Sequence, residues 1–141
     1  MKSLYDDLLD ALKESELGQN LSVYESYSPQ TPQYPAIFIE ESLNREQLTI
    51  GGAERLTMVA YRFEILTRAE WDETQQCVIS RRKQAQRIAN QLDEWLRTTF
   101  HLTRRGDAVY LPHVDETLGR YIVTYQGYLS DGYIYQKGEY L

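Results

Sequence analysis

Residues 56–69, LTMVAYRFEILTRA, give the clearest secondary-structure signal in the chain. Every second position is apolar over most of this stretch, and these positions hold Val59, Tyr61, Phe63 and Ile65. Successive side chains of a β-strand point to opposite faces, so this period of two predicts a strand with one buried face.

The sequence on both sides of this stretch predicts more extended structure. We expect strands over residues 21–27, 36–42, 108–113, 119–130 and 133–135, with turns at 104–107 and 131–132. Three prolines between residues 28 and 35 exclude a central strand there and predict a crossing loop. Residues 43–55 are polar and contain Gly51 and Gly52, so we interpret them as a mobile hairpin arm.

Two helices are predicted from apolar residues at a period near 3.6. The first is expected to stop at Gly18, and its apolar face holds Leu4, Leu8, Leu9 and Leu12. The second is expected to begin at Asp72, because Gln75 follows as in a capping box, and to run to about residue 99. About 27 residues would make it roughly 40 Å long, so one end is expected to overhang the sheet. Its predicted buried stripe contains Val78, Ile79, Ile88, Ala89, Leu92, Trp95 and Leu96, with Cys77 at the edge.

The predicted order of elements is therefore α-β-β-β-α-β-β. The economical arrangement is an α+β fold, in which two helices pack on one face of a mostly antiparallel sheet. No linker, repeat or low-complexity segment interrupts the pattern. We expect residues 1–141 to form a single domain, with residues 43–55 as its arm.

Composition narrows the class of protein. The chain has 141 residues, a net charge of −6 and one cysteine. A stapled secreted scaffold needs paired cysteines, and a nucleic-acid coat needs clustered cations, so neither is expected. The apolar runs are too short to span a bilayer, and the N-terminus lacks the apolar stretch of a signal peptide. We expect a protein without a membrane partner that is intracellular when synthesised.

Catalytic motifs are missing from the sequence. His101, His113 and Cys77 have no metal-ligand or nucleophile spacing, so we predict no metal, no cofactor and no catalytic residue. The element order is also that of restriction-endonuclease-like nucleases, which use an acid-x-Lys pair to bind a divalent cation. Glu64 is followed by Ile65 and Leu66, so the lysine is missing, although Glu40 and Glu41 remain candidate ligands.

A basic run lies on the second predicted helix and includes Arg81, Arg82 and Arg87. It is either the solvated face of an amphipathic helix or a contact for DNA or for an acidic partner surface, and the net charge favours the acidic surface over DNA. Seven tyrosines crowd residues 110–140, where they serve β-structure or a protein interface. Among them we select Tyr121, Tyr125, Tyr133 and Tyr135 as interface candidates.

Four segments together resemble a known family. They are YPAIFIEE at 34–41, YRFEIL at 61–66, RIANQLDEWL at 87–96 and YIVTYQG at 121–127. With the short first helix and the polar arm, this pattern looks like the tail terminator proteins of long-tailed bacteriophages, also called tail completion or minor tail proteins. The resemblance covers most of the chain. Head–tail connector proteins of similar size resemble it as well.

The resemblance implies a structural virion protein rather than an enzyme. Such proteins form a ring, here expected to be a hexamer, that caps the tail tube, ends its polymerisation and provides the surface for head joining. The implied partners are other copies of the chain, the tail tube protein and the head–tail connector protein, and DNA only passes through the ring. The implied location is the virion tail or neck, and the host cytoplasm during assembly. A connector or adaptor protein and a metal-dependent nuclease are the alternatives.

A ring subunit needs two complementary faces for a closing head-to-tail contact. The basic run and the acidic first helix, which carries Asp6 and Asp10, form one candidate pair. If this pairing is right, reversing Arg82 and Arg87 to Glu is expected to weaken assembly.

Overall fold

The computed structural model describes residues 4–25, 32–50, 54–111, 115–130 and 133–134. Its sheet contains β1 (Ser22–Glu25), β2 (Ala36–Ile50), β3 (Glu54–Thr67), β7 (Gly119–Ser130) and β6 (Thr103–Leu111), in that spatial order. A short β8 (Tyr133–Ile134) pairs with the end of β7. The β1–β2 pair is parallel and the other pairs are antiparallel. The predicted α+β fold with a mostly antiparallel sheet is therefore confirmed.

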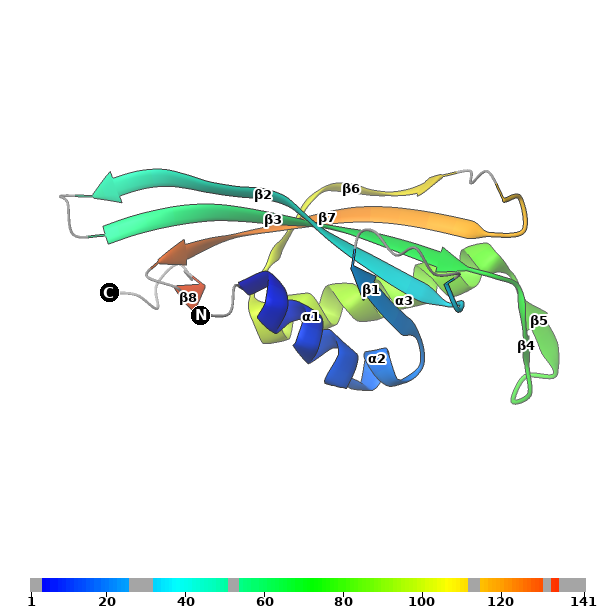
Figure 1. Ribbon diagram of the computed structural model, residues 1–141. Coiled ribbons are helices and arrows are strands. Elements are labelled where there is room, and N and C mark those ends of the chain that lie inside the picture. Colours follow the sequence, from blue (N-terminus) through cyan, green and yellow to red (C-terminus); the bar gives the residue numbers. More distant parts are fainter. Residues whose placement is uncertain (1–3, 26–31, 51–53, 112–114, 131–132, 135–141) are drawn as a thin grey trace.

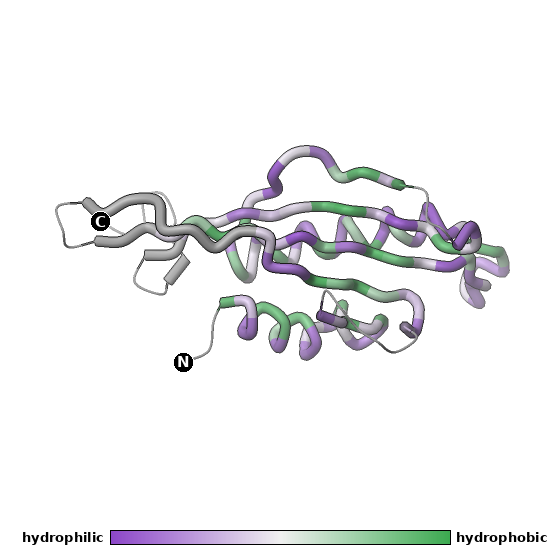
Figure 2. Tube along the Cα trace, turned by 45° about the horizontal axis from the view of Figure 1, so that its top comes forward, coloured by the Kyte–Doolittle hydropathy of each residue, from purple (hydrophilic) through white to green (hydrophobic). Residues whose placement is uncertain are grey.

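Two helices, α1 (Leu4–Glu14) and α3 (Arg81–Trp95), lie on the same side of the sheet (Figure 1). We call the covered side the helix face and the other side the open face. The alternating set predicted on β3 points to the helix face, where all four side chains are buried. Figure 2 shows both hydrophobic and hydrophilic residues along the central strands, and on β3 the charged Arg62 and Glu64 alternate with the buried set. The core closes with apolar helix residues, which are Leu8, Leu9, Leu12, Ala85, Ile88, Ala89, Leu92 and Leu96.

The first helix ends earlier than the sequence predicted. Its last residue is Glu14, and a short α2 (Glu16–Gln19) follows directly. Ser15 separates the two helices, because its Oγ accepts a hydrogen bond from the N–H of Gly18 at 3.1 Å. The prediction that Gly18 stops the helix was wrong, since Gly18 lies inside the second short helix.

The predicted arm is largely regular β-structure. β2 and β3 pair from Ala36 opposite Leu66 to Ile50 opposite Glu54, with register shifts at Ser42 and at Gln47. The hairpin is confirmed, but the strand end predicted near residue 42 was wrong, and residues 51–53 lie outside the described part. Figure 1 shows this hairpin running well beyond both helices. None of the described helices covers it there, so the sequence has no need for apolar alternation. Mobility of the arm stays a prediction.

The second predicted helix begins with a hairpin instead. Residues 70–79 form β4 (Glu70–Asp72) and β5 (Cys77–Ile79), and α3 starts only at Arg81. The Asp72 carboxylate accepts hydrogen bonds from the N–H groups of Thr74 and Gln75, at 2.8 and 3.2 Å, as it would at a helix start. The true cap is Ser80, whose Oγ accepts from the Lys83 N–H at 3.1 Å.

This hairpin changes the predicted stripe and length. Val78 is 64 % exposed and Cys77 is exposed, whereas Ile79 is buried. After Trp95 the chain continues as a π-helical segment, η1 (Leu96–Phe100). Because α3 itself has 15 residues, it is about 22 Å long rather than 40 Å. At the base of the hairpin, the buried Thr67 donates a hydrogen bond from Oγ1 to the Arg81 carbonyl at 2.5 Å.

The C-terminal strands also differ in part from the prediction. β7 has the predicted bounds, but β6 starts at Thr103 and includes the expected turn at 104–107. The pairing with β7 is interrupted between Arg105 and Val109, where Gly106 has a φ of 74°. A glycine in this conformation is typical of a β-bulge, which bends a strand without ending it. Residues 131–132, the other predicted turn, lie outside the described part.

Candidate functional site

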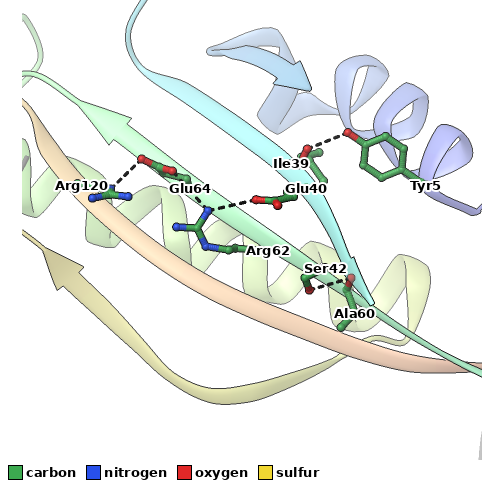
Figure 3. Close-up of polar contacts among 8 residues, drawn as sticks. All are labelled: Tyr5, Ile39, Glu40, Ser42, Ala60, Arg62, Glu64 and Arg120. Atoms are coloured by element: carbon green, nitrogen blue, oxygen red, sulfur yellow. Dashed lines mark hydrogen bonds and ion pairs between the residues drawn. The ribbon is translucent and has the colours of Figure 1, made fainter. Parts of the chain in front are cut away.

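Four charged residues form a connected row on the open face of the sheet (Figure 3). Arg62 on β3 lies 3.4 Å from a carboxylate oxygen of Glu40 on β2, and 3.7 Å from one of Glu64. Arg120 on β7 donates a hydrogen bond from Nε to Glu64 at 2.8 Å. Arg62 and Glu64 alternate with the buried Tyr61, Phe63 and Ile65, which places the row on the face away from the helices.

The four charged residues link neighbouring strands and are poorly suited to binding a cation. The Glu64 carboxylate already contacts two arginines, and a positive guanidinium repels a metal ion at the same place. Within the described ranges, no three His, Cys, Asp or Glu side chains gather in a way that could hold a metal ion. His101 is exposed at the end of η1, and His113 lies outside these ranges.

One edge of the sheet is acidic. Tyr5 on α1 donates a hydrogen bond to the Ile39 carbonyl at 2.8 Å, which joins the helix to β2. The pKa of Tyr5 is raised, first by burial and then by the negative charges of the surrounding Glu25, Asp6, Glu41 and Glu40. These four carboxylates come from α1, β1 and β2, and all are exposed. We call them the acidic edge.

The opposite edge of the sheet is basic. Arg104 and Arg105 are exposed on the edge strand β6. The guanidinium of Arg82 lies 5.4 Å from the ring centre of Tyr110, which belongs to the same strand, so this part of α3 extends to β6. We call these three arginines the basic edge. Sequence reasoning found Arg82 but missed Arg104 and Arg105, because residues 104–107 were read as a turn.

The structure separates the three arginines predicted on the second helix. Only Arg82 lies at the basic edge. Arg81 is half-buried, and its carbonyl is tied to Thr67. Arg87 is exposed, on the side of α3 opposite the stripe formed by Ala85, Ile88, Ala89 and Leu92.

The two aspartates predicted as their partners are both on α1. Asp6 is exposed and belongs to the acidic edge, and Asp10 is half-buried. α1 packs beside β1, whereas α3 packs under β3 and β7. The acidic and the basic helix therefore lie toward opposite edges of the sheet, as a head-to-tail contact requires.

The selected tyrosines that the structure describes have different environments. Tyr125 is 1 % exposed and packs edge-on against Phe63, with ring centres 5.7 Å apart, so its ring offers no surface to a partner. Its hydroxyl donates a hydrogen bond to Asp93 on α3 at 2.5 Å. Burial, together with this bond and the charge of Asp93, raises the pKa of Tyr125. For this residue the interface prediction was wrong, since burial within its own subunit explains it.

The other three selected tyrosines are Tyr121, Tyr133 and Tyr135. Tyr121 is half-buried, and its ring centre is 6.5 Å from that of Tyr110 on β6. Tyr133 belongs to β8, where its backbone pairs with Ser130. Tyr135 lies outside the described residues. Interface roles for Tyr121, Tyr133 and Tyr135 stay predictions.

Comparisons with known proteins add no family. No protein-family model matches the chain, and no curated protein matches it. In the described part of the chain, no helix is both long and apolar enough to cross a membrane.

Proposed function

We propose that this chain is a structural virion protein of a long-tailed bacteriophage, and that it caps the tail tube as a ring. In this role it ends tail polymerisation and provides the surface for head joining. The protein needs no cofactor and catalyses no reaction. Its partners are its own copies, the tail tube protein and the head–tail connector protein.

The observation that carries the proposal is the difference between the two edges of the sheet. A ring is closed by head-to-tail contacts, in which one patch of each subunit binds a different patch of the next. The acidic edge and the basic edge are two such patches, and they lie at opposite ends of the strand order. An isologous dimer would place like charges together, so the charge distribution favours a ring.

The architecture agrees with the family resemblance of the sequence. The short helix, the long β2–β3 hairpin, the second helix and the final strands are elements that the resemblance implies, whereas α2 and the β4–β5 hairpin were not predicted. The hairpin extends beyond the helices (Figure 1), which gives each subunit a part that reaches toward neighbours or toward the tube.

Light scattering and electron microscopy test the proposal. The mass of the purified protein is measured over a concentration series with Mg²⁺, and the same samples are imaged in negative stain. Images of six-membered rings would support the proposed ring assembly. If the protein stays monomeric, purified tail tubes are added, and caps at one tube end are the expected result. A monomer that leaves the tubes bare would overturn the proposal, and rings that bind heads but not tubes would replace it with a head–tail connector.

A further inference from the structure

Among the described residues, both edges of the sheet are open along part of their length. β1 covers β2 only from Ala36 to Ile39. Beyond Ile39, no described strand pairs with the outer side of β2, and none pairs with the outer side of β6. Each open edge presents backbone N–H and C=O groups that another strand can use.

The strand register connects the charges at these two edges. Glu40 is opposite Arg62, Arg62 is opposite Thr124, and Thr124 is opposite Arg105. In the next row, Glu41 is opposite Tyr61, Tyr61 is opposite Tyr125, and Tyr125 is opposite Arg104. Each row thus begins with a glutamate at one edge and ends with an arginine at the other.

The two rows also lie on different faces. Residues directly opposite each other share a face, and Tyr61 and Tyr125 point to the helix face. Glu41 and Arg104 therefore belong to the helix face, and Glu40 and Arg105 to the open face. Burial is the main cause of the raised pKa of Tyr61, and the negative charge of Glu41 adds to it. Burial and Asp93 raise the pKa of Tyr125, and the positive charge of Arg104 partly opposes them, which agrees with this placement.

We propose that β6 of one subunit adds to the open edge of β2 of the next copy, with Arg104 opposite Glu41 and Arg105 opposite Glu40. This inference rests on the proposed ring and names its contact. β6 is antiparallel to β7, and β7 runs in the same direction as β2. In a ring whose axis follows the strands, β6 therefore meets the next β2 in the antiparallel sense, which allows direct cross-strand pairs.

The interruption of the β6–β7 pairing lies at a row of the strand register that fits this contact. Glu25, the last residue of β1, pairs with Ile39, so in the described part of the chain β2 is the edge strand from Glu40 onward. On the other side of the sheet, β6 leaves its ladder just after Arg105, the residue in the row of Glu40. Both edges of the sheet therefore change at the same row of the register. The two arginines lie in the rows of Glu41 and Glu40, where β1 no longer pairs with β2.

The charges select this contact over the other two edge pairings. β6 against β6 would bring arginines together, and β2 against β2 would bring glutamates together. Charged residues on edge strands commonly prevent association in this way. Only β6 against β2 joins opposite charges, and it uses two different patches, as ring closure requires.

Charge reversal in the row of Glu41 and Arg104 tests the contact, because both side chains are exposed. Glu41→Arg and Arg104→Glu are each expected to raise the concentration for half-assembly by about tenfold or more. The double variant E41R/R104E restores opposite charges and is expected to assemble nearly as the wild type does. Circular dichroism and the thermal midpoint show that each variant is folded.

Mixing the two single variants gives a sharper test. The E41R subunit has arginine at both edges, and the R104E subunit has glutamate at both, so each is expected to assemble poorly alone. In an equimolar mixture the two alternate, every contact joins opposite charges, and rings return. Alternation needs an even number of subunits, which a hexamer has.

Lys83 and Glu94 provide the matched control. Both are exposed on α3, neither was selected as an interface candidate, and K83E and E94R make the same charge changes. These variants and their double are expected to assemble normally. If the wild type forms rings and E41R and R104E assemble equally well, the proposed edge contact is overturned. The same holds if the double variant does not restore assembly. Neither result contradicts the proposed ring. A wild-type chain that forms no ring, alone or on tail tubes, would overturn both.

Discussion

Tyr61 on β3 and Tyr125 on β7 lie directly opposite each other in the core, but only the Tyr125 hydroxyl has a hydrogen-bond partner within the described residues. Its partner, Asp93, also binds Arg97, with 3.1 Å between Nε and Oδ2. The Tyr61 hydroxyl is buried without such a partner, which is costly for a polar group. Two neighbouring residues of the same type therefore contribute differently to stability.

Removing each hydroxyl is expected to have opposite effects. Tyr125→Phe loses a hydrogen bond to a charged group and should lower the free energy of unfolding by about 1–2 kcal/mol. Tyr61→Phe removes an unsatisfied buried hydroxyl and should leave that free energy unchanged or raise it by up to about 1 kcal/mol. Urea unfolding of both variants, at one protein concentration, measures the difference. Equal losses would show that Tyr61 has a partner after all.

Stability is expected to fall in alkaline solution. Burial raises the pKa of both tyrosines in the folded protein above the value of about 10 expected in the unfolded chain. Their contribution is complete below about pH 10 and is lost as the pH rises, since the unfolded chain releases protons that the folded protein keeps. Each tyrosine should cost up to about 1.4 kcal/mol for each pH unit above that value.

Urea unfolding between pH 8 and 11 measures this dependence. Y61F is expected to reduce the slope above pH 10, because it removes one of the two groups. Tyr128, which is 40 % exposed, provides the control variant Y128F. An equal slope in Y61F, Y128F and the wild type would contradict the assigned cause.

The start of α3 can be tested at two residues that look alike in the sequence. Ser80 caps the helix, so Ser80→Ala is expected to lower the free energy of unfolding by about 1 kcal/mol. Asp72 caps only the turn of an exposed hairpin, so Asp72→Ala should cost clearly less. Thermal unfolding of the two variants compares them directly. A larger loss for D72A would place the helix start back at Asp72.

The charged row predicts how the protein responds to Mg²⁺. A ligand that binds the folded state raises the thermal midpoint, but Glu64 is already held by Arg62 and Arg120. Millimolar Mg²⁺ is therefore expected to leave the midpoint of the protein unchanged, and a DNA plasmid should stay intact. Glu64→Gln should lower the free energy of unfolding by up to about 1 kcal/mol. Stabilisation by Mg²⁺ that disappears in E64Q would favour the nuclease instead.

The sequence predicted best where one face of an element is buried. Val59 and Phe63 alternate with polar residues because one side of β3 meets the helices, and the structure confirms this face. The same argument could not find the outer half of β2, since none of the helices in the described part covers it and no apolar period results. Backbone pairing with β3 holds that half in place, and pairing leaves little trace in a single sequence.

Local sequence patterns gave wrong predictions where two kinds of local structure use the same hydrogen bonds. Asp72 accepts from N–H groups two and three residues ahead, which suits both a helix cap and a turn. Gly106 was read as part of a turn, although it forms a bulge within β6. The sequence therefore did not reveal the candidate contact in full. Only the strand register shows that Arg104 and Arg105 lie in the same rows as Glu41 and Glu40.

The hydrogen bond between Thr67 and Arg81 makes the β4–β5 hairpin a side branch of the fold. Both ends of this branch are fixed, so extra residues at its exposed tip, between Glu73 and Gln76, only lengthen a loop that is already closed. A short peptide tag inserted there would give each subunit one external label. Counting such labels on a single assembled particle would then give the number of subunits directly, without symmetry averaging.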